Sequence, residues 1–411
     1  MPEPVTTAWL DTVGADLDAM LAQADAELRE RFPGPGSGRQ PVHTVYVPAD
    51  QVTADLGPRW GQQAADVLDR HGERLGLEPE LLARVRAKLA AEPVEDLRVD
   101  FEDGYGVRDD ETEDAAVHAG VRALAEAAEQ GTAPPFVGIR FKSLEAPTRR
   151  RGVRTLGLFV AGLVESGRGL DGVVVTLPKV TSVEQVEAMV RCCDSLEERL
   201  ALPGGAIGFE IQVETPQCVL GPDGTALVAR MLHAADGRCT GLHYGTYDYS
   251  ASCGIAAGYQ SMEHPVADHA KAVMQVAAAG TAVRLSDGST NLLPVGDEEQ
   301  VLAAWQTHQR LVRRSLERGF YQGWDMHPAQ LPTRFAATFG FYRDGLTTTA
   351  DRLRRYVEQT SSGVLDEPAT ARALADFLAR GLDCGALDDD EVRAGTGLDI
   401  GGIWEMARPG R

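Results

Sequence analysis

Two carboxylates that follow apolar segments are the residues best suited to hold a metal ion. Glu214 follows the segment 207–213 (IGFEIQV), and Asp248 follows 241–245 (GLHYG). Two carboxylates that project into one site repel each other unless a cation lies between them. Their oxygen-only ligand set favours Mg²⁺, with Mn²⁺ as the alternative, over zinc. The pair predicts a divalent metal site, and two unrelated, solvated acids are the alternative interpretation.

Arg140 is a cation inside an apolar segment, 136–141 (FVGIRF). A buried guanidinium needs an anionic partner. We expect it to bind a substrate carboxylate or an enolate oxygen beside the metal, because its planar fork matches such groups. A structural ion pair with Glu102 or Asp103, which follow the segment 97–101 (LRVDF), is the alternative. Glu102 and Asp103 are also candidates for catalytic proton transfer, and the choice of base stays open.

Four further polar residues lie at or near the ends of apolar segments and are candidates for substrate binding: Lys179, Gln212, Thr246 and His327. Lys179 follows a proline and is expected to bind an anion, with a surface lysine as the alternative. For His327 the alternative is a buried histidine with its hydrogen bonds satisfied.

These residues need a scaffold that brings the ends of several segments together. Eight short apolar runs predict strands, at 43–48, 97–101, 136–141, 172–177, 207–213, 241–245, 282–285 and 323–326. They alternate with Ala-, Leu- and Glu-rich stretches of helical period. This alternation of strands and helices predicts the α/β fold class. The expected architecture is a (β/α)₈ TIM barrel with its active site at the C-terminal ends of the strands. A doubly wound open sheet is the alternative, although no G-x-G-x-x-G follows the first run.

The chain divides into three parts. Residues 1–40 are expected to form a helix (7–32) and a Pro/Gly linker, and residues 41–335 the barrel. After about residue 335 the pattern is helical, at 349–360, 368–380 and 389–394. We expect 336–411 to be a helical extension that acts as a lid or an oligomer contact.

Composition narrows the class of protein. The 411 residues are 43% hydrophobic, which is ample for a barrel core, and 61 acidic against 40 basic residues give a net charge of -21. Such a surface repels phosphate backbones and anionic lipid, so no nucleic-acid or membrane partner is expected. The six cysteines form no C-x-x-C pair, and the acidic N-terminus does not resemble a signal peptide. We expect a cytoplasmic protein.

Seven short motifs stand in register across residues 43–328. They are Val47-Pro48-Ala49, Val99-Asp100-Phe101-Glu102-Asp103-Gly104, Gly138-Ile139-Arg140, Leu177-Pro178-Lys179, Val213-Glu214-Thr215, Gly245-Thr246-Tyr247-Asp248 and Met326-His327-Pro328. Together they resemble the superfamily of HpcH/HpaI 2-oxo-acid aldolases, citrate lyase β-subunits and malyl-CoA lyases. The turn around Asp248 is also similar to that of malate synthases, a related barrel.

The resemblance implies a Mg²⁺-dependent enzyme with Glu214 and Asp248 as metal ligands, a small-molecule carboxylate substrate, and a homo-oligomer, trimeric or hexameric. The sequence departs from the family's R-I-N motif, which is Arg140-Phe141-Lys142 here. The use of coenzyme A stays open.

Three functions therefore compete. The first is a carbon–carbon lyase or aldolase that acts through the enolate of a 2-oxo acid or a related β-hydroxy acid. The second is a CoA-thioester lyase, condensing or hydrolysing enzyme of the malyl-CoA or citramalyl-CoA kind. The third is a non-catalytic barrel that serves as a binding subunit. The intact set of Arg140, Glu214 and Asp248 favours an enzyme.

Overall fold

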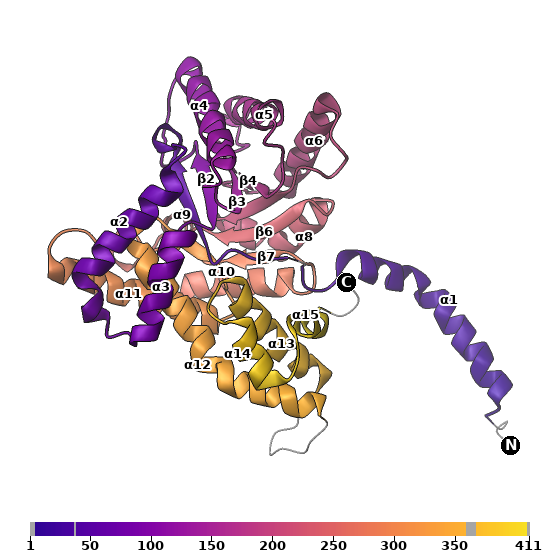
Figure 1. Ribbon diagram of the computed structural model, residues 1–411. Helices are drawn as coiled ribbons and strands as arrows, with labels where there is room; N and C mark the ends of the chain where they lie inside the picture. Colours follow the sequence, from indigo (N-terminus) through magenta and orange to yellow (C-terminus); the bar gives the residue numbers. More distant parts are fainter. Residues whose placement is uncertain (1–4, 37, 359–366, 409–411) are drawn as a thin grey trace.

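A closed barrel of parallel strands forms the centre of the protein (Figure 1), seen in a computed structural model that describes residues 5–36, 38–358 and 367–408. The strands are β1 His43–Pro48, β2 Asp96–Asp100, β3 Phe136–Arg140, β4 Val173–Leu177, β5 Phe209–Val213, β6 Cys239–Tyr244, β7 Arg284–Ser286 and β8 Gly323–Asp325. All eight predicted strands are present, and the prediction of a (β/α)₈ barrel is confirmed.

The sheet closes on itself between β7 and β8. The other strands are paired in the order β7-β6-β5-β4-β3-β2-β1-β8, all parallel. Across the remaining gap, the Asp287 amide donates to Gln322 O (2.9 Å) and the Trp324 amide donates to Gly288 O (3.2 Å). The fold is therefore a barrel, and the open-sheet alternative is excluded.

Helices surround the barrel (Figure 1). They are α2 Leu56–His71, α3 Pro79–Ala91, α4 Asp110–Glu129, α5 Arg149–Glu165, α6 Val183–Leu200, α8 Leu227–Ala234, α10 Pro265–Ala278 and α11 Glu298–Glu317, with short α7 Pro216–Val219 and α9 Thr246–Ser252. Successive strand side chains alternate between the two faces of the sheet. In β3, Val137 and Ile139 join the apolar core while Arg140 lines the barrel mouth.

The middle of the barrel holds a layer of charged and polar side chains. Arg98, 1% exposed, forms an ion pair with Asp96 and another with Glu210 (Nη2 to Oε2, 3.1 Å). His243 Nε2 lies 2.8 Å from the same oxygen, Oε2, of Glu210. Branched apolar side chains usually fill this space in such barrels. Here the layer of side chains beneath the mouth is polar. Tyr46, which lines the mouth, donates a hydrogen bond to Glu210 of this layer (3.3 Å).

The first helix, α1 Thr7–Arg31, projects away from the barrel (Figure 1). None of its 25 residues is buried. Apolar side chains such as Trp9 and Met20 remain exposed, at 53% and 72%. The helix expected at 7–32 is thus present, and none of its side chains is part of the hydrophobic core.

The C-terminal helices lie at the end of the barrel where the strands begin. α12 Leu331–Val357 begins beside the mouth and runs to this end, where it packs against α13 Pro368–Asp383 and α14 Asp389–Thr396, and α15 Ile400–Ala407 packs on α13. Arg380 of α13 donates to Gln40 Oε1 (2.8 Å) before β1, and its guanidinium lies 4.4 Å from the ring of Tyr321 before β8. The expected domain boundary at 335 falls inside α12, which is continuous.

Two further sequence expectations concern long helices. The helix expected at 349–360 is the second half of α12, and residues 359 and 360 lie outside the described residues. Among the residues that the structure describes, no helix combines the length and apolar character needed to cross a bilayer.

Candidate metal centre

A cavity of about 420 Å³ opens at the C-terminal ends of the strands. Its walls come from several strand ends, which is how a barrel gathers residues that are distant in sequence. The lining residues include Tyr46, Asp100, Asp103, Arg140, Glu214, Thr246, Asp248, Ser289 and Trp324. Most of the predicted site residues therefore meet in one place.

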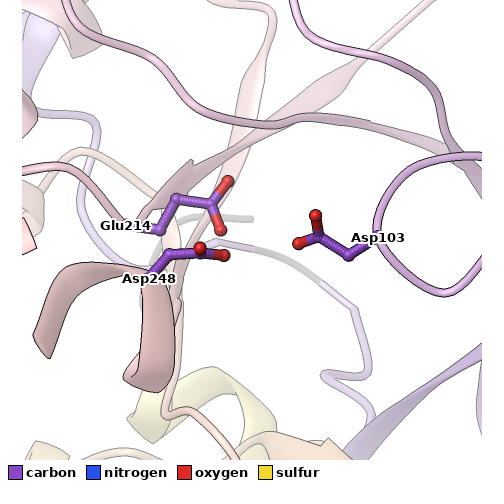
Figure 2. Close-up of side chains that lie close together, drawn as sticks. All are labelled: Asp103, Glu214 and Asp248. Carbon is purple, nitrogen blue, oxygen red and sulfur yellow. The ribbon is translucent and has the colours of Figure 1, made fainter. Parts of the chain in front are cut away.

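Three carboxylates face one another in this cavity (Figure 2). Asp103 comes from the loop after β2, Glu214 follows β5, and Asp248 lies in the first turn of α9. One oxygen atom from each lies within 4.8 Å of the others. Asp103, predicted as a catalytic acid, thus lies beside the predicted metal pair.

Glu214 is the most enclosed of the three, at 1% exposure. Its Oε1 accepts a hydrogen bond from the Lys179 amide (2.7 Å), and its Oε2 accepts one from Gln212 Nε2 (2.6 Å). Burial raises the pKa of Glu214 to about 8, although Lys179 and Arg140 oppose the shift. Gln212, predicted to bind substrate, lies beside Glu214 and orients it.

Lys179 brings positive charge into the acid cluster. Its backbone is in the left-handed region (φ 51°), and its Nζ lies 3.0 Å from Asp248 Oδ2, 3.1 Å from Asp103 Oδ2 and 3.3 Å from Glu102 Oε1. Burial acts to lower the pKa of Lys179, but the surrounding carboxylates raise it overall. In this arrangement the ammonium offsets part of the negative charge of the cluster.

Arg140 forms a bidentate ion pair with Asp100. Nε lies 2.7 Å from Oδ1 and Nη2 lies 2.6 Å from Oδ2. Glu102 Oε2 is a second, more distant partner, 3.6 Å from Nη1. The alternative of an ion pair with Glu102 is thus present in part, but the main partner is an acid that the sequence did not single out for this role.

Glu102 is a mostly enclosed acid beside these cations. Its side chain is 9% exposed. Burial raises the pKa of Glu102 to about 7, and Arg140 offsets only part of this effect. A carboxyl group with such a pKa can hold or release a proton near neutral pH.

Two aromatic rings flank Arg140, and sequence reasoning missed both. The guanidinium carbon lies 4.8 Å from the ring centre of Tyr46 and 5.4 Å from that of Trp324. The rings stand edge to face, 4.3 Å apart. The two rings cover one side of the Arg140 guanidinium. Its remaining N–H donors are therefore available on the side of the cavity. Aromatic residues in strands β1 and β8 were the only available signal.

Lys142 is a third residue of the site whose part the sequence did not reveal. It is 7% exposed, and its Nζ donates to Phe101 O (2.7 Å), Gly106 O (3.2 Å) and Glu113 Oε2 (2.6 Å). The two carbonyls bracket the loop that carries Glu102 and Asp103. Lys142 therefore anchors this loop, and the departure from the R-I-N motif was the signal that pointed to it.

The last two predicted residues differ in their positions. Thr246 is buried, lines the cavity, and accepts a hydrogen bond from the Ser289 amide (3.2 Å). His327 lines a separate groove of about 540 Å³ together with α2 residues such as Arg70. Its Nδ1 accepts from the Ala329 amide (3.1 Å). Thr246 thus belongs to the mouth, and His327 caps a turn beside it.

The donor set fits a divalent cation. Three carboxylates supply oxygen ligands only, as Mg²⁺ prefers. The raised pKa of the buried Glu214 shows that Lys179 and Arg140 do not fully compensate its charge. In addition, Gln212 Oε1 is buried without a hydrogen-bond partner among the described residues. A cation held by Asp103, Glu214 and Asp248 would supply the missing positive charge.

Comparisons with known proteins agree with the barrel. A family model described as "Domain of unknown function (DUF6986)" matches residues 21–409. No curated protein matches the sequence. The Haloferax volcanii malate synthase, solved as a magnesium/glyoxylate complex, is similar with a TM-score of 0.51 and 12% identity, over 90% of this chain and 97% of that one. This match shows that the two chains share a fold.

Two further solved structures belong to the superfamily that the motifs resemble. A citrate lyase beta subunit from M. tuberculosis, complexed with oxaloacetate and magnesium, has a TM-score of 0.42 and 18% identity, over 76% of this chain and 99% of that one. An HpcH/HpaI aldolase/citrate lyase family protein from Burkholderia cenocepacia has a TM-score of 0.41 and 15% identity, over 74% and 93%. The barrel fold that the motifs imply is confirmed by the match to the malate synthase.

Proposed function

The chain belongs to the family described as Domain of unknown function (DUF6986), and we propose that its barrel mouth is the active site of a Mg²⁺-dependent carbon–carbon lyase or aldolase. The substrate class is a 2-oxo acid or a related β-hydroxy acid. The convergence of three carboxylates and Arg140 in one cavity carries the proposal. The malate synthase of the same fold, which was solved with magnesium and glyoxylate, a small 2-oxo acid, supports it.

Asp103, Glu214 and Asp248 would hold the metal. A bound Mg²⁺ supplies positive charge that stabilises a developing oxyanion. Lys179, now 3.0 Å from Asp248, shares these carboxylates and would move aside as the ion enters. Gln212 and the Lys179 amide keep Glu214 in place.

Arg140 would bind the substrate carboxylate. Asp100 occupies Nε and one N–H of Nη2, which leaves further donors of the same guanidinium on the cavity side. A carboxylate bound there would face the acid cluster across the mouth. Charge-assisted bonds of this kind are about twice as strong as neutral ones.

The proton transfer is assigned to Glu102. In the cleavage direction a base takes the hydroxyl proton, the carbon–carbon bond breaks, and its electron pair becomes the enolate. Condensation follows the same steps in reverse. Glu102 lies between Arg140 and Lys179 and has a pKa of about 7, so its carboxylate can accept a proton there and its acid form can return one.

Proton exchange into pyruvate tests the proposal and requires only the 2-oxo-acid half of the substrate. An enzyme that forms the enolate of pyruvate should replace the methyl protons with deuterium in D₂O, which NMR detects. We expect exchange with Mg²⁺, none with EDTA, and a loss of at least ~10²-fold in Glu214→Gln, because one of three ligand charges is removed.

The controls separate the competing functions. Arg140→Lys should bind Mg²⁺ normally by calorimetry but bind pyruvate, oxaloacetate or glyoxylate at least ~10-fold more weakly, since the fork is lost. A wild-type protein without Mg²⁺ affinity would overturn the proposal. Stabilisation by acetyl-coenzyme A, with no response to free 2-oxo acids, would instead indicate a thioester substrate.

A further inference from the structure

Three arginines gather at the opposite end of the barrel, around a cavity of about 170 Å³. Arg284 begins β7, Arg380 lies in α13, and Arg408 follows α15. Gln40 and Tyr321 complete the walls. The cavity lies where the strands begin, so it is separated from the mouth by the full length of the barrel.

Two of these guanidinium groups converge on a single carbonyl oxygen. Arg284 Nη2 and Arg408 Nη1 lie 3.5 Å and 3.4 Å from Gly38 O. Both bonds are long, and one oxygen serves two cations. The pKa of Arg284 is lowered first by burial and then by the positive charges of Arg380 and Arg408. The arginines are therefore close enough to repel one another.

One acid beside the cluster is shared by two of its arginines. Asp376 accepts from Arg380 Nε (2.7 Å) and from Arg408 Nη2 (3.4 Å), so two cations share one carboxylate. Asp383 also acts electrostatically on Arg284, and burial raises the pKa of Asp383 to about 6. Three arginines thus share one cavity in a protein whose overall charge is -21.

Arg408 also carries an unused donor. The residue is 9% exposed, and its Nε is buried without a hydrogen-bond partner among the described residues. A buried N–H of a charged group is costly to leave unpaired. An acceptor in the adjacent cavity would remove this cost and would screen the three guanidinium groups from one another.

We propose that this cavity binds a small oxyanion, held by Arg284, Arg380 and Arg408. Guanidinium groups bind phosphate and carboxylate oxygens through paired N–H donors, and two or more convergent arginines select such groups. A bound oxyanion joins β7, the linker residue Gly38 and the C-terminal helices, so it stabilises the packing of the helical extension on the barrel. This site does not depend on the chemistry proposed for the mouth.

Thermal unfolding and calorimetry on the full chain test the site. The probes are sodium phosphate, sodium acetate and sodium chloride at matched ionic strength and saturating Mg²⁺. We expect phosphate or acetate, but not chloride, to raise the Tm of the wild type, and the responding anion identifies the chemistry. Arg408→Gln should lower the affinity for that anion at least ~10-fold, because one charge-assisted pair is lost.

Matched variants keep the test decisive. Arg408→Lys keeps the charge without the fork and should bind with intermediate affinity, which also covers the case in which Arg408→Gln folds poorly. Arg310→Gln removes an exposed charge paired with Glu263 elsewhere and should behave as the wild type. Equal stabilisation by all three salts would overturn the proposal. So would an affinity that Arg140→Gln abolishes and Arg408→Gln preserves, because the anion would then bind at the mouth.

Discussion

Asp100 and Arg140 lie directly opposite each other in the register of β2 and β3 and form a bidentate ion pair across it. The same carboxylate accepts hydrogen bonds from the amides of Glu102 and Gly104, both at 3.0 Å. One side chain thus fixes both the arginine proposed to bind substrate and the loop that carries Glu102 and Asp103.

Asp100→Asn should therefore disturb the site more than the fold. An amide keeps the size but replaces one acceptor with a donor and leaves Arg140 without its paired charge. We expect the rate of pyruvate proton exchange to fall at least ~10²-fold, with Mg²⁺ affinity reduced less than ~10-fold. The matched control is Asp114→Asn, which removes an acid paired with Arg151 and Arg154 away from the mouth. Unchanged exchange in Asp100→Asn would show that Arg140 needs no such support.

Lys142→Met should loosen the loop from 101 to 106. The variant keeps the length of the side chain but removes its bonds to the carbonyls of Phe101 and Gly106. We expect weaker Mg²⁺ binding, by about 10-fold, because Asp103 is no longer held in place. We also expect a loss of stability, because the buried Glu113 loses one of its two cationic partners and keeps only Arg151 (3.2 Å). The double variant Lys142→Met with Glu113→Gln should regain stability but not Mg²⁺ affinity. Recovery of both would mean that Lys142 acts only through the buried pair.

Lys179→Met should change the response to Mg²⁺ rather than abolish it. The ammonium offsets part of the negative charge of Asp103, Asp248 and Glu102 when no other cation is present. Without it, like charges repel, so the Tm in EDTA should fall. Because no ammonium competes with the ion, Mg²⁺ should bind several-fold more tightly and raise the Tm further than in the wild type. A variant with weaker Mg²⁺ binding would show that Lys179 instead supports the ligands.

Metal binding should release a proton at neutral pH. Since the pKa of Glu214 is raised to about 8, the folded, metal-free protein holds a proton there that the unfolded chain loses near pH 4.5. The metal-free protein should thus lose stability as the pH rises from about 4.5 through 8, whereas the apparent Mg²⁺ affinity should rise over the same range. Calorimetry at pH 7 in buffers of different ionisation enthalpy measures the released proton. A heat that is independent of the buffer would contradict the assignment.

The barrel was predictable because each strand carries its own signal. An apolar run of β-type residues such as 172–177, bounded by glycine and proline, differs clearly from the helical stretches on either side. The structure places β4 at Val173–Leu177, within one residue of that expectation. Active-site residues at strand ends then follow from the architecture.

Contacts that depend on register or on turn geometry were not predictable. Asp100 pairs with Arg140 because β2 and β3 align at this residue, and sequence alone does not give that alignment. His327 follows β8, but the turn that it caps directs it into the groove beside α2. The helix α15 contains Gly401 and Gly402, which disfavour a helix, yet the Asp399 cap and the buried Ile403 stabilise it through tertiary packing.

The continuity of α12 limits how the protein can move. Its 27 residues span about 40 Å, from the turn beside the mouth to the C-terminal helices at the far end. A helix of this length resists bending, so the C-terminal helices cannot swing over the mouth of their own barrel while α12 stays intact. A movement of these helices would instead tilt α12 as a lever against α3 and α11, and the displacement would reach the turn Pro328–Gln330 that directly precedes α12.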